Sequence, residues 1–437
     1  MHELSHIPGN NGWPLVGHAF QYLFNFEQFT RDYFKRYGDV ARFHAFGLNF
    51  VDLLGPEANQ FVMQNRDDLF RSGAWEKMIG PFFHRGLMLL DGEEHRLHRR
   101  VMQAAFTNAA LREDLQGINR TLADSLAAWP TGEGVRVFDL LKSMTLDIAS
   151  RVFLGQPAGK DSDALNRAFL ATVQAATGVV RKDLPGTRWR AGLRGRKLLV
   201  DHFSAELAMR RQSTASDLFT RLCHARTDDG VLFSDEDVIN HLVFLLMAAH
   251  DTSTITLTNL MYQLARQPAW QERLREQSRA LGRDQLDYED LERLEDMDRA
   301  MKETLRLTPP VPGLPREATR EFEYGGHRIP AGTLVSISIW MTHRLEKWWK
   351  DPEAFDPDRY APGRAEDKQH PFLWLPFGGG AHKCIGMHFG AMEVKAALHQ
   401  LLLRFRWSVP QDYVMPQDWT SLPIPKDRLP LRLERLQ

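Results

Sequence analysis

Cysteine is scarce in this sequence. The 437 residues contain two, Cys223 and Cys384, which lie far apart in the chain. This number and spacing exclude both a disulfide framework and a Cys-x-x-Cys zinc site. Because unpaired cysteines are typical of a reducing compartment, we expect a cytoplasmic protein.

A surplus of one charge and a long apolar run are also absent. The formal net charge is -1, which gives no reason to expect a nucleic-acid partner. The longest apolar run, Leu242–Ala249, has eight residues, and a membrane-spanning helix needs about 18 or more. Residues 1–12 lack the basic start and apolar core of a signal peptide. We therefore expect neither a transmembrane segment nor a signal peptide.

The sequence contains no Gly-x-Ser-x-Gly or His-Glu-x-x-His motif, so it gives no support for a hydrolase or a zinc enzyme. It also has no internal repeat or low-complexity linker. Length alone would allow about three domains, but without a linker we expect one domain over 1–437, and nothing demands more than a monomer.

Periodicity predicts a mainly α fold with a smaller β-rich portion. Four prolines between Arg306 and Pro315 must end any helix there. Strands with a Gly325-Gly326 turn are expected in the stretch Glu321–Trp340. The remaining expected elements are a helix over 27–37, short strands over 39–54, mostly helix over 57–305, and a final helix over 386–404.

One cysteine stands on a glycine-rich loop directly before the last helical pattern. Glycines at 378, 379, 380 and 386 allow positive φ and close approach to a flat ligand, while His382 and Lys383 add positive charge near Cys384. Both effects favour the thiolate. For a single cysteine considered alone, an inert buried side chain is the commoner interpretation.

The segment Phe377–Gly386 resembles the haem-binding loop of the cytochrome P-450 superfamily, whose pattern is Phe-x-x-Gly-x-[Arg/His]-x-Cys-x-Gly, and every position matches. The resemblance covers nearly the whole chain. It implies the cytochrome P-450 fold, with haem b (iron protoporphyrin IX) between the long central helix and the helix after the cysteine loop. Cys384 would be the iron ligand, and Phe377, Gly378 and Gly386 would contact the haem.

A polar cluster, His250–Thr254, interrupts the apolar helix that is predicted to begin at Ser234. Such a cluster alone is more often a helix kink with satisfied side chains. Residues 248–253 resemble the central-helix pattern of the family, except that Ala249 replaces the usual Gly. The resemblance implies that Asp251 and Thr252 deliver protons during dioxygen activation.

Glu303 and Arg306 stand three residues apart, and Arg359 follows in a Phe-Asp-Pro-Asp-Arg segment. Pairs at this spacing usually lie on a solvated helix surface. In the family such residues form one cluster, so the resemblance implies that these three support the cysteine loop.

Haem propionates need cationic or hydrogen-bonding partners. By motif position the resemblance implies four of them, each of which could alone be a surface group. They are His95, Arg99, Arg316 and His382.

The resemblance also implies a basic patch of Arg96, Arg100 and Lys383 on the cysteine side of the haem, which would suit an acidic electron donor. The chain has no room for a fused reductase or ferredoxin module. Electrons must then come from a separate protein, for which a ferredoxin with its reductase is the first expectation and flavodoxin the second.

The expected substrate is apolar and lipid-like, such as a terpenoid, steroid or fatty acid. The residues expected to line the substrate pocket could instead simply pack in the core. They are Phe82, Phe83, Leu87, Met247, Ala248, Val311 and Leu314.

Seven basic residues and one acid lie between Arg181 and Lys197. Such a run is usually a solvated face. It could instead attract an anionic substrate or rest against an acidic membrane surface.

Together these features predict a haem-thiolate monooxygenase that inserts one oxygen atom from O₂ into an apolar small molecule, by hydroxylation or epoxidation. A peroxide-driven haem-thiolate oxygenase is one alternative, which the intact Asp251-Thr252 pair disfavours. A haem-binding sensor without turnover is another, and it would need the Cys384 loop but not the proton relay.

Overall fold

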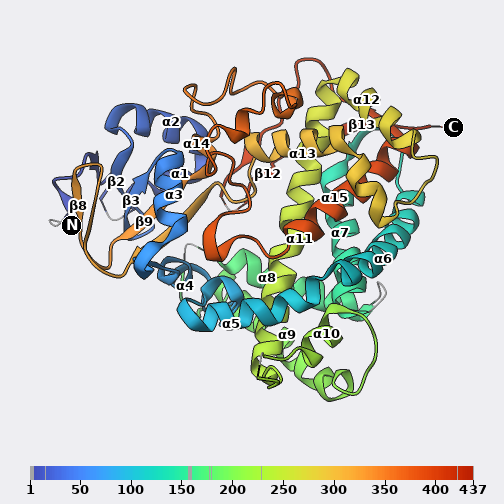
Figure 1. Ribbon diagram of the computed structural model, residues 1–437, viewed down its shortest axis with the longest axis horizontal. Coiled ribbons are helices and arrows are strands. Elements are labelled where there is room, and N and C mark those ends of the chain that lie inside the picture. Colours follow the sequence, from blue (N-terminus) through green and yellow to red (C-terminus); the bar gives the residue numbers. More distant parts are fainter. Residues whose placement is uncertain are drawn as a thin grey trace.

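The computed structural model describes residues 4–436 except for 15, 156–159, 177, 179, 228 and 421. Helices dominate it (Figure 1). The α-helices are α1 Ala19–Phe24, α2 Phe26–Tyr37, α3 Pro56–Gln64, α4 Gly73–Ile79, α5 Gly92–Gln103, α6 Asn108–Ala127, α7 Val137–Leu154, α8 Lys160–Ala176, α9 Arg188–Arg210, α10 Leu218–His224, α11 Asp235–Arg266, α12 Pro268–Arg279, α13 Glu295–Leu307, α14 Ile339–Thr342 and α15 Met387–Arg404.

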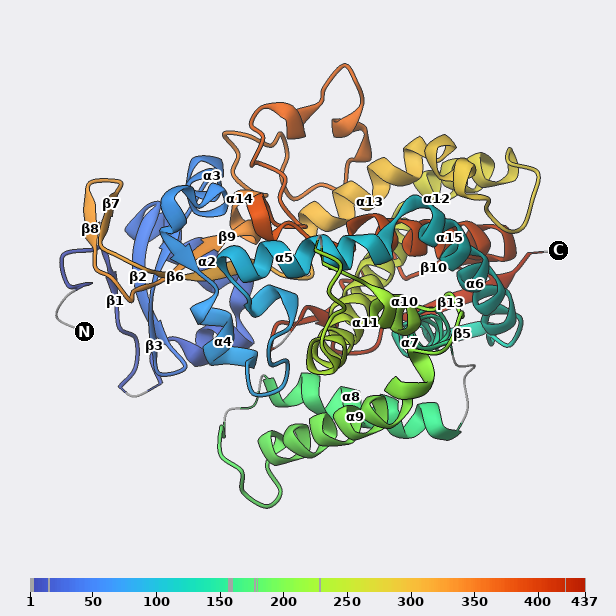
Figure 2. The same cartoon turned by 60° about the horizontal axis from the view of Figure 1, so that its bottom comes forward.

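The longest helix, α11, runs through the middle of the helical part (Figures 1 and 2). Ser234 caps its first turn, because its Oγ accepts a hydrogen bond from the Asp237 amide at 3.0 Å. Buried, mostly apolar residues occupy most positions of α11, and the helix packs against α7, α9, α13 and α15. A helix that is hydrophobic all round must lie in the core, which is where α11 lies.

The largest sheet has the order β1-β2-β3-β9-β6-β4 and joins the first strands to late ones. It lies at the end of the molecule away from α12 and α15 (Figure 1). Strands β10, β13 and β5 form a second sheet, and β11-β12 and β7-β8 are two-stranded. The strands are β1 Gly9–Asn10, β2 Val40–Ala45, β3 Leu48–Leu53, β4 Phe70–Arg71, β5 Gly132–Arg136, β6 Gly313–Ala318, β7 Phe322–Tyr324, β8 His327–Ile329, β9 Leu334–Ser338, β10 Phe405–Ser408, β11 Gln417–Asp418, β12 Ile424–Pro425 and β13 Pro430–Arg435.

The structure confirms the predicted element types in outline. Helices α2 and α15, strands β2 and β3, and the hairpin β7-β8 fall within one or two residues of their predicted ranges. One correction applies: residues 339–340 begin the short helix α14 instead of ending a strand. The stretch 57–305 is mostly helical, as expected, and contains the short strands β4 and β5. Within that stretch, residues 156–159 lie outside the described residues.

Candidate functional site

The cysteine loop is a tight backbone structure held against α3. The Cys384 amide donates to the Phe377 carbonyl at 2.9 Å, and the Gly378 amide donates to the Leu375 carbonyl at 3.0 Å. Gly380 has φ +61°, and a Cβ on it would stand 1.8 Å from the Met63 carbonyl oxygen of α3. Only glycine fits both constraints. The loop therefore presents Cys384 from a fixed position just before α15.

The Cys384 side chain is accessible to a water-sized probe, although protein surrounds it closely. Burial raises the pKa of its thiol, while the Gly386 amide, Arg99 and Lys383 act in the opposite direction. The expectation that neighbouring residues favour the thiolate is thus only partly met. Burial also lowers the pKa of His382, so Arg99 supplies charge that the sequence interpretation had assigned to His382.

The acid and the alcohol of the central helix lie side by side on α11. Oδ1 of Asp251 is 3.1 Å from Nδ1 of His250 and 3.6 Å from Nζ of Lys142 on α7. These groups lower the pKa of Asp251 against the effect of its burial. The Thr252 hydroxyl donates to the Ala248 carbonyl at 2.8 Å. Helix α11 continues through this polar cluster without ending.

Partly exposed surface remains on α11 near its contact with α15. Ser253 of α11 donates to Glu393 of α15 at 2.5 Å, which fixes the crossing of the helices. Ala248, Ala249 and Thr252 nevertheless keep partly exposed surface in an otherwise buried helix. A Cβ on Gly386, at the start of α15, would meet no atom within 4 Å. Open space beside an accessible thiol is what a haem needs.

Cationic and imidazole side chains gather at one side of this space. His95 of α5 stacks on His382 with ring centroids 4.0 Å apart. Burial and the charges of His382, Arg99 and Arg316 lower the pKa of His95 to about 3. All four residues predicted as propionate partners are therefore brought together.

Arg316 of β6 forms no ion pair within 4 Å among the described residues, although the Asp91 carboxylate acts on its pKa from further away. It is 7% exposed, and its Nη1 donates to the Pro315 carbonyl at 2.9 Å. Burial lowers its pKa to about 10. A buried guanidinium without a carboxylate costs free energy, and a propionate would supply the missing anion. The cluster thus fits the haem expected from the sequence.

Glu303, Arg306 and Arg359 form one buried ion cluster, as predicted. Arg306 contacts both carboxylate oxygens of Glu303, at 2.8 and 2.9 Å, and Nε of Arg359 is 2.9 Å from Oε1. All three side chains are fully buried. Arg359 also pairs with Glu366 at 2.6 Å, a residue that the sequence motif does not include.

His343 connects this cluster to the cysteine loop, which sequence reasoning missed. Its Nδ1 lies 3.1 Å from the Arg306 carbonyl, and its Nε2 accepts from the Leu375 amide at 3.0 Å. These two contacts are satisfied together when the proton is on Nδ1. Burial lowers the pKa of His343 to about 3, which keeps the ring neutral. No sequence spacing pointed to this role of His343, nor to the contacts of Lys142 and Glu393.

The predicted substrate residues divide into two groups. Phe82 and Phe83 are fully buried and Leu87 is 4% exposed; Phe82 packs edge-on against Trp189 at 4.8 Å. These three behave as core. Partly exposed surface remains on the other four, which are Met247, Ala248, Val311 and Leu314.

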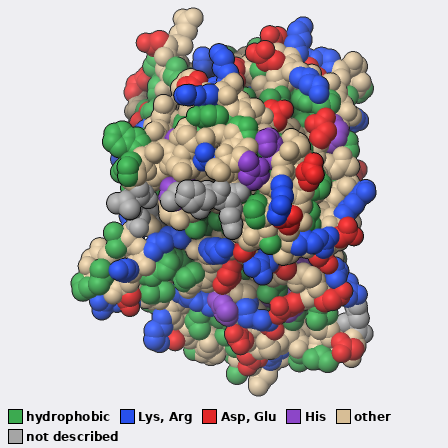
Figure 3. Space-filling model, turned by 90° about the vertical axis from the view of Figure 1, so that its left-hand side faces the viewer, with side chains coloured by type: hydrophobic (Ala, Val, Ile, Leu, Met, Phe, Trp, Pro, Cys, Tyr) green, Lys and Arg blue, Asp and Glu red, His purple; other side chains and the backbone are tan. Residues whose placement is uncertain are grey.

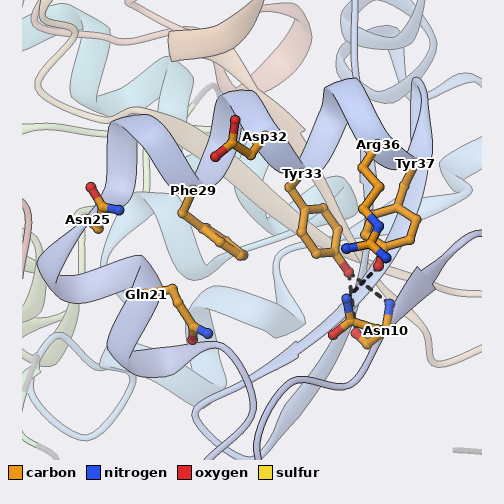
Figure 4. Close-up of a pocket in the computed structure, with 8 residues that line it drawn as sticks. All are labelled: Asn10, Gln21, Asn25, Phe29, Asp32, Tyr33, Arg36 and Tyr37. Atoms are coloured by element: carbon orange, nitrogen blue, oxygen red, sulfur yellow. Dashed lines mark hydrogen bonds between the residues drawn. The ribbon is translucent and has the colours of Figure 1, made fainter.

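A separate small pocket lies away from this site, between α1, α2 and β1 (Figure 4). Its volume is about 230 Å³. Asn10 hydrogen-bonds to Tyr33 and Tyr37 at its wall. None of the residues predicted for the site lines it. The lining residues are Asn10, Gln21, Asn25, Phe29, Asp32, Tyr33, Arg36 and Tyr37.

Comparison with known proteins decides the family. A sequence profile described as Cytochrome P450 matches residues 7–431. The chain belongs to the cytochrome P450 family. A Mycobacterium tuberculosis protein named cytochrome P450 136 is 42% identical over 98% of this chain and 89% of that protein. Taxane 10-beta-hydroxylase of Taxus cuspidata is 27% identical over 93% of this chain and 84% of its own length.

The fold agrees with a solved member of the family. The retinoic acid-bound cyanobacterial CYP120A1 superposes with a TM-score of 0.88, at 27% identity, over 98% of this chain and 99% of that one. The protein is thus a cytochrome P450 monooxygenase, and the family implies a haem cofactor, dioxygen, an organic substrate and a redox partner. Among the described residues, no helix is long and apolar enough to cross a membrane.

Proposed function

We propose that this cytochrome P450, one domain over 1–437, binds haem b through Cys384 and hydroxylates or epoxidises an apolar small molecule. The observation that carries the proposal is the accessible Cys384 thiol beside open space, with the unpaired buried Arg316 guanidinium nearby. His95, Arg99, Arg316 and His382 would hold the propionates.

Haem bound through a thiolate supplies the reductive cleavage of dioxygen. The chain itself must bring protons to that reaction. His250 and Lys142 lower the pKa of Asp251, so its carboxylate would pass a proton on instead of holding it. Lys142 is 30% exposed and connects Asp251 to solvent. The Thr252 hydroxyl would pass the proton on by way of an ordered water.

A terpenoid, steroid or fatty-acid-like substrate agrees with the lining residues Met247, Ala248, Val311 and Leu314. The taxane hydroxylase and the retinoic acid-bound relative support this class, since both names describe largely apolar molecules. The hydrocarbon part of such a molecule would be held by its shape and by apolar contacts.

The electron donor is proposed to be a separate ferredoxin with its reductase, or a flavodoxin. Arg96, Arg100 and Lys383 are exposed on α5 and the cysteine loop and would face an acidic partner. The two free cysteines, Cys223 and Cys384, fit a reducing compartment, and we propose that the protein is a cytoplasmic monomer.

The test is the absorption spectrum of the purified holoprotein, reduced and exposed to carbon monoxide. A strongly red-shifted Soret band that is lost in Cys384→His supports thiolate ligation. Ferric spectra during titration with terpenoids, steroids and fatty acids then identify the ligand class. A carbonyl band at the position of histidine-ligated haem in the wild type would overturn the proposal.

A further inference from the structure

The basic run between residues 181 and 197 ends on a side of α9 that carries a single charge. Positions 189, 193, 196 and 200 lie on one side of this helix, because neighbours in the series are three or four residues apart. A Cβ on Gly195, on the adjoining side, would stand 2.3 Å from the Ala168 carbonyl oxygen of α8, so that side is tightly packed. The side chains in the series instead keep partly exposed surface. They are Trp189, Leu193, Arg196 and Val200.

The contacts of Arg196 show that this side of α9 points into the molecule. Its Nη1 donates to the Phe82 carbonyl at 3.0 Å, and its Nη2 donates to Oδ1 of Asn240 on α11 at 2.8 Å. Trp189 packs edge-on against Phe82 with ring centroids 4.8 Å apart. Helices α8 and α9 lie side by side next to α11 (Figure 2). We therefore call Trp189, Leu193, Arg196 and Val200 the inner face of α9.

Arg196 differs from the cations of the outer surface in having no acid beside it. On the surface drawn in Figure 3, lysine and arginine side chains stand among aspartate and glutamate side chains. Arg196 forms no ion pair within 4 Å among the described residues, and both oxygens that it contacts are neutral. Burial lowers its pKa, and Glu236 opposes this from further away. A guanidinium held away from water without a counter-charge costs free energy, which a bound anion would remove.

Asn240 carries a second unsatisfied donor at the same place. The residue is 3% exposed, and its Nδ2 is buried without a hydrogen-bond partner among the described residues. Turning the amide over would not help, because the Arg196 guanidinium has only donors and needs Oδ1 as its acceptor. A buried donor without an acceptor costs free energy. Arg196 and Asn240 thus lack the same kind of partner, which is an acceptor oxygen with negative charge.

We propose that Arg196 binds the carboxylate of an apolar acid, and that apolar acids are the substrates of this enzyme. The inference rests on the proposed oxygenase function and specifies its substrate class. A planar guanidinium can form two parallel hydrogen bonds with a carboxylate. One cation also balances one carboxylate, whereas a phosphate ester would keep an excess of buried negative charge.

The position of Asn240 on α11 gives the orientation of such an acid. Asn240 stands seven residues before Met247 and therefore on the same side of the helix. Thr252 follows Asn240 after twelve residues, or about 18 Å along the helix axis. A carboxylate at Arg196 would leave the apolar part of the acid to extend along α11 toward Met247 and Thr252. The carbons that are oxidised would then lie far from the carboxylate.

The experiment is equilibrium binding of matched probes to the ferric holoprotein. Hexadecanoic acid, geranylgeranoic acid and lithocholic acid are each compared with the primary alcohol of the same skeleton. Calorimetry gives Kd, and the spin-state change in the absorption spectrum shows that the probe lies at the haem. The wild type should bind at least one acid about 10-fold or more tightly than its alcohol, because only the acid supplies the missing counter-charge of Arg196.

Variants on both sides of the contact separate charge from packing. Arg196→Gln should raise Kd of the preferred acid about 10- to 100-fold, as expected for the loss of a charge-assisted hydrogen bond, and leave Kd of the alcohol nearly unchanged. Arg196→Lys keeps the charge and should keep a preference for the acid. Asn240→Asp leaves Arg196 in place but supplies a carboxylate from the protein itself, so it should also remove the preference.

Arg194→Gln is the matched control for the charge of the helix. Arg194 is exposed and stands two residues from Arg196, so this variant removes a cation from α9 without changing the inner face. Its preference for the acid should equal that of the wild type. All variants should keep the red-shifted carbonyl Soret band, which reports an intact haem site.

Three results would overturn the proposal. The wild type could bind none of the three acids more tightly than its alcohol. Arg196→Gln could weaken acid and alcohol equally, which would make Arg196 a structural tie between Phe82 and α11. Arg194→Gln could remove the preference as fully as Arg196→Gln does, which would assign it to the general charge of the basic run. Absence of the red-shifted band in the wild type would instead contradict the proposed function, and calorimetry measures acid binding independently of that band.

Discussion

At the residue scale, Thr252 differs from its neighbours on α11 by its surroundings and not by its backbone contact. Thr252 and Thr256 each donate to the carbonyl four residues earlier, at 2.8 Å. Thr256 is 5% exposed and packed, whereas Thr252 keeps surface on the open side of the helix. Only one of the two hydroxyls can therefore meet dioxygen or substrate.

Replacing Thr252 by Ala should uncouple electron use from product formation. Product per electron pair should fall about tenfold or more, as expected when a positioned proton donor is lost, and hydrogen peroxide should rise. Thr256→Ala is the matched control and should remain coupled. Measuring NADH, product and peroxide together tests this. Equal coupling in wild type and Thr252→Ala would favour a haem protein without turnover.

At the scale of elements, Glu303 is the centre of a buried ion cluster that we propose supports the cysteine loop. The Glu303 carboxylate accepts hydrogen bonds from Arg306, Arg359, the Asp356 amide and the Tyr360 hydroxyl. Glu303→Gln should destabilise the protein by about 3–5 kcal/mol, because Arg306 loses its buried counter-charge and Arg359 keeps only Glu366. Urea unfolding and the carbonyl Soret band measure stability and haem retention.

The control for this variant uses the same helical spacing on the surface. Glu93 pairs with Arg96 three residues later, and both side chains are exposed. Glu93→Gln should leave the urea midpoint within experimental error. If Glu303→Gln and Glu93→Gln behaved alike, the buried cluster would have no special structural role.

The attachment of the cysteine loop to α3 gives a second prediction. Gly380→Ala forces a Cβ against the Met63 carbonyl at a positive φ, which should cost about 1–3 kcal/mol. The variant should also bind haem less tightly. Gly363→Ala is the control, since a Cβ there meets nothing within 4 Å and its φ is not positive. Haem transfer to apomyoglobin measures the loss, and equal transfer rates for the two variants would contradict the prediction.

The sequence predicted the types of the elements well, whereas it did not reveal the long-range contacts between them. Prolines after Arg306 and the alternation before Trp340 are local signals, so the elements there followed from them. Cys384, Glu303 and Arg359 followed from family spacing. His343, Lys142 and Glu393 act through single long-range hydrogen bonds, which leave no periodicity. Phe82 and Phe83 were expected in the pocket because composition cannot tell a core aromatic from a lining one.

At the scale of the whole molecule, buried titratable groups oppose each other as pH changes. Burial raises the pKa of Asp52 to about 7 and that of Glu393 to about 8. It lowers the pKa of His95, His241 and His343 to about 3. Between pH 3 and 6.5 the unfolded chain binds more protons at the histidines, so their contribution to stability rises with pH.

Above pH 6.5 the two acids outweigh the histidines, which the unfolded chain still protonates in part near that pH. At the acids the folded state holds protons that the unfolded state has lost, so stability should fall by about 1 kcal/mol between pH 6.5 and 8. Glu393→Gln should flatten most of this fall, because the amide cannot ionise. Exposed Glu346→Gln is the control. Urea midpoints across this pH range test it, and an unchanged slope in Glu393→Gln would contradict it.

The order of strands in the large sheet also determines when the sheet can be completed during translation. Strand β3 is paired in parallel with β9, so residues 50–53 wait for residues 334–337. During translation the hairpin β2-β3 leaves the ribosome with an open edge, and most of the chain must follow before that edge is covered. An uncovered edge invites pairing with other chains. The yield of folded protein should therefore depend on chaperones and on elongation rate more than its final stability suggests.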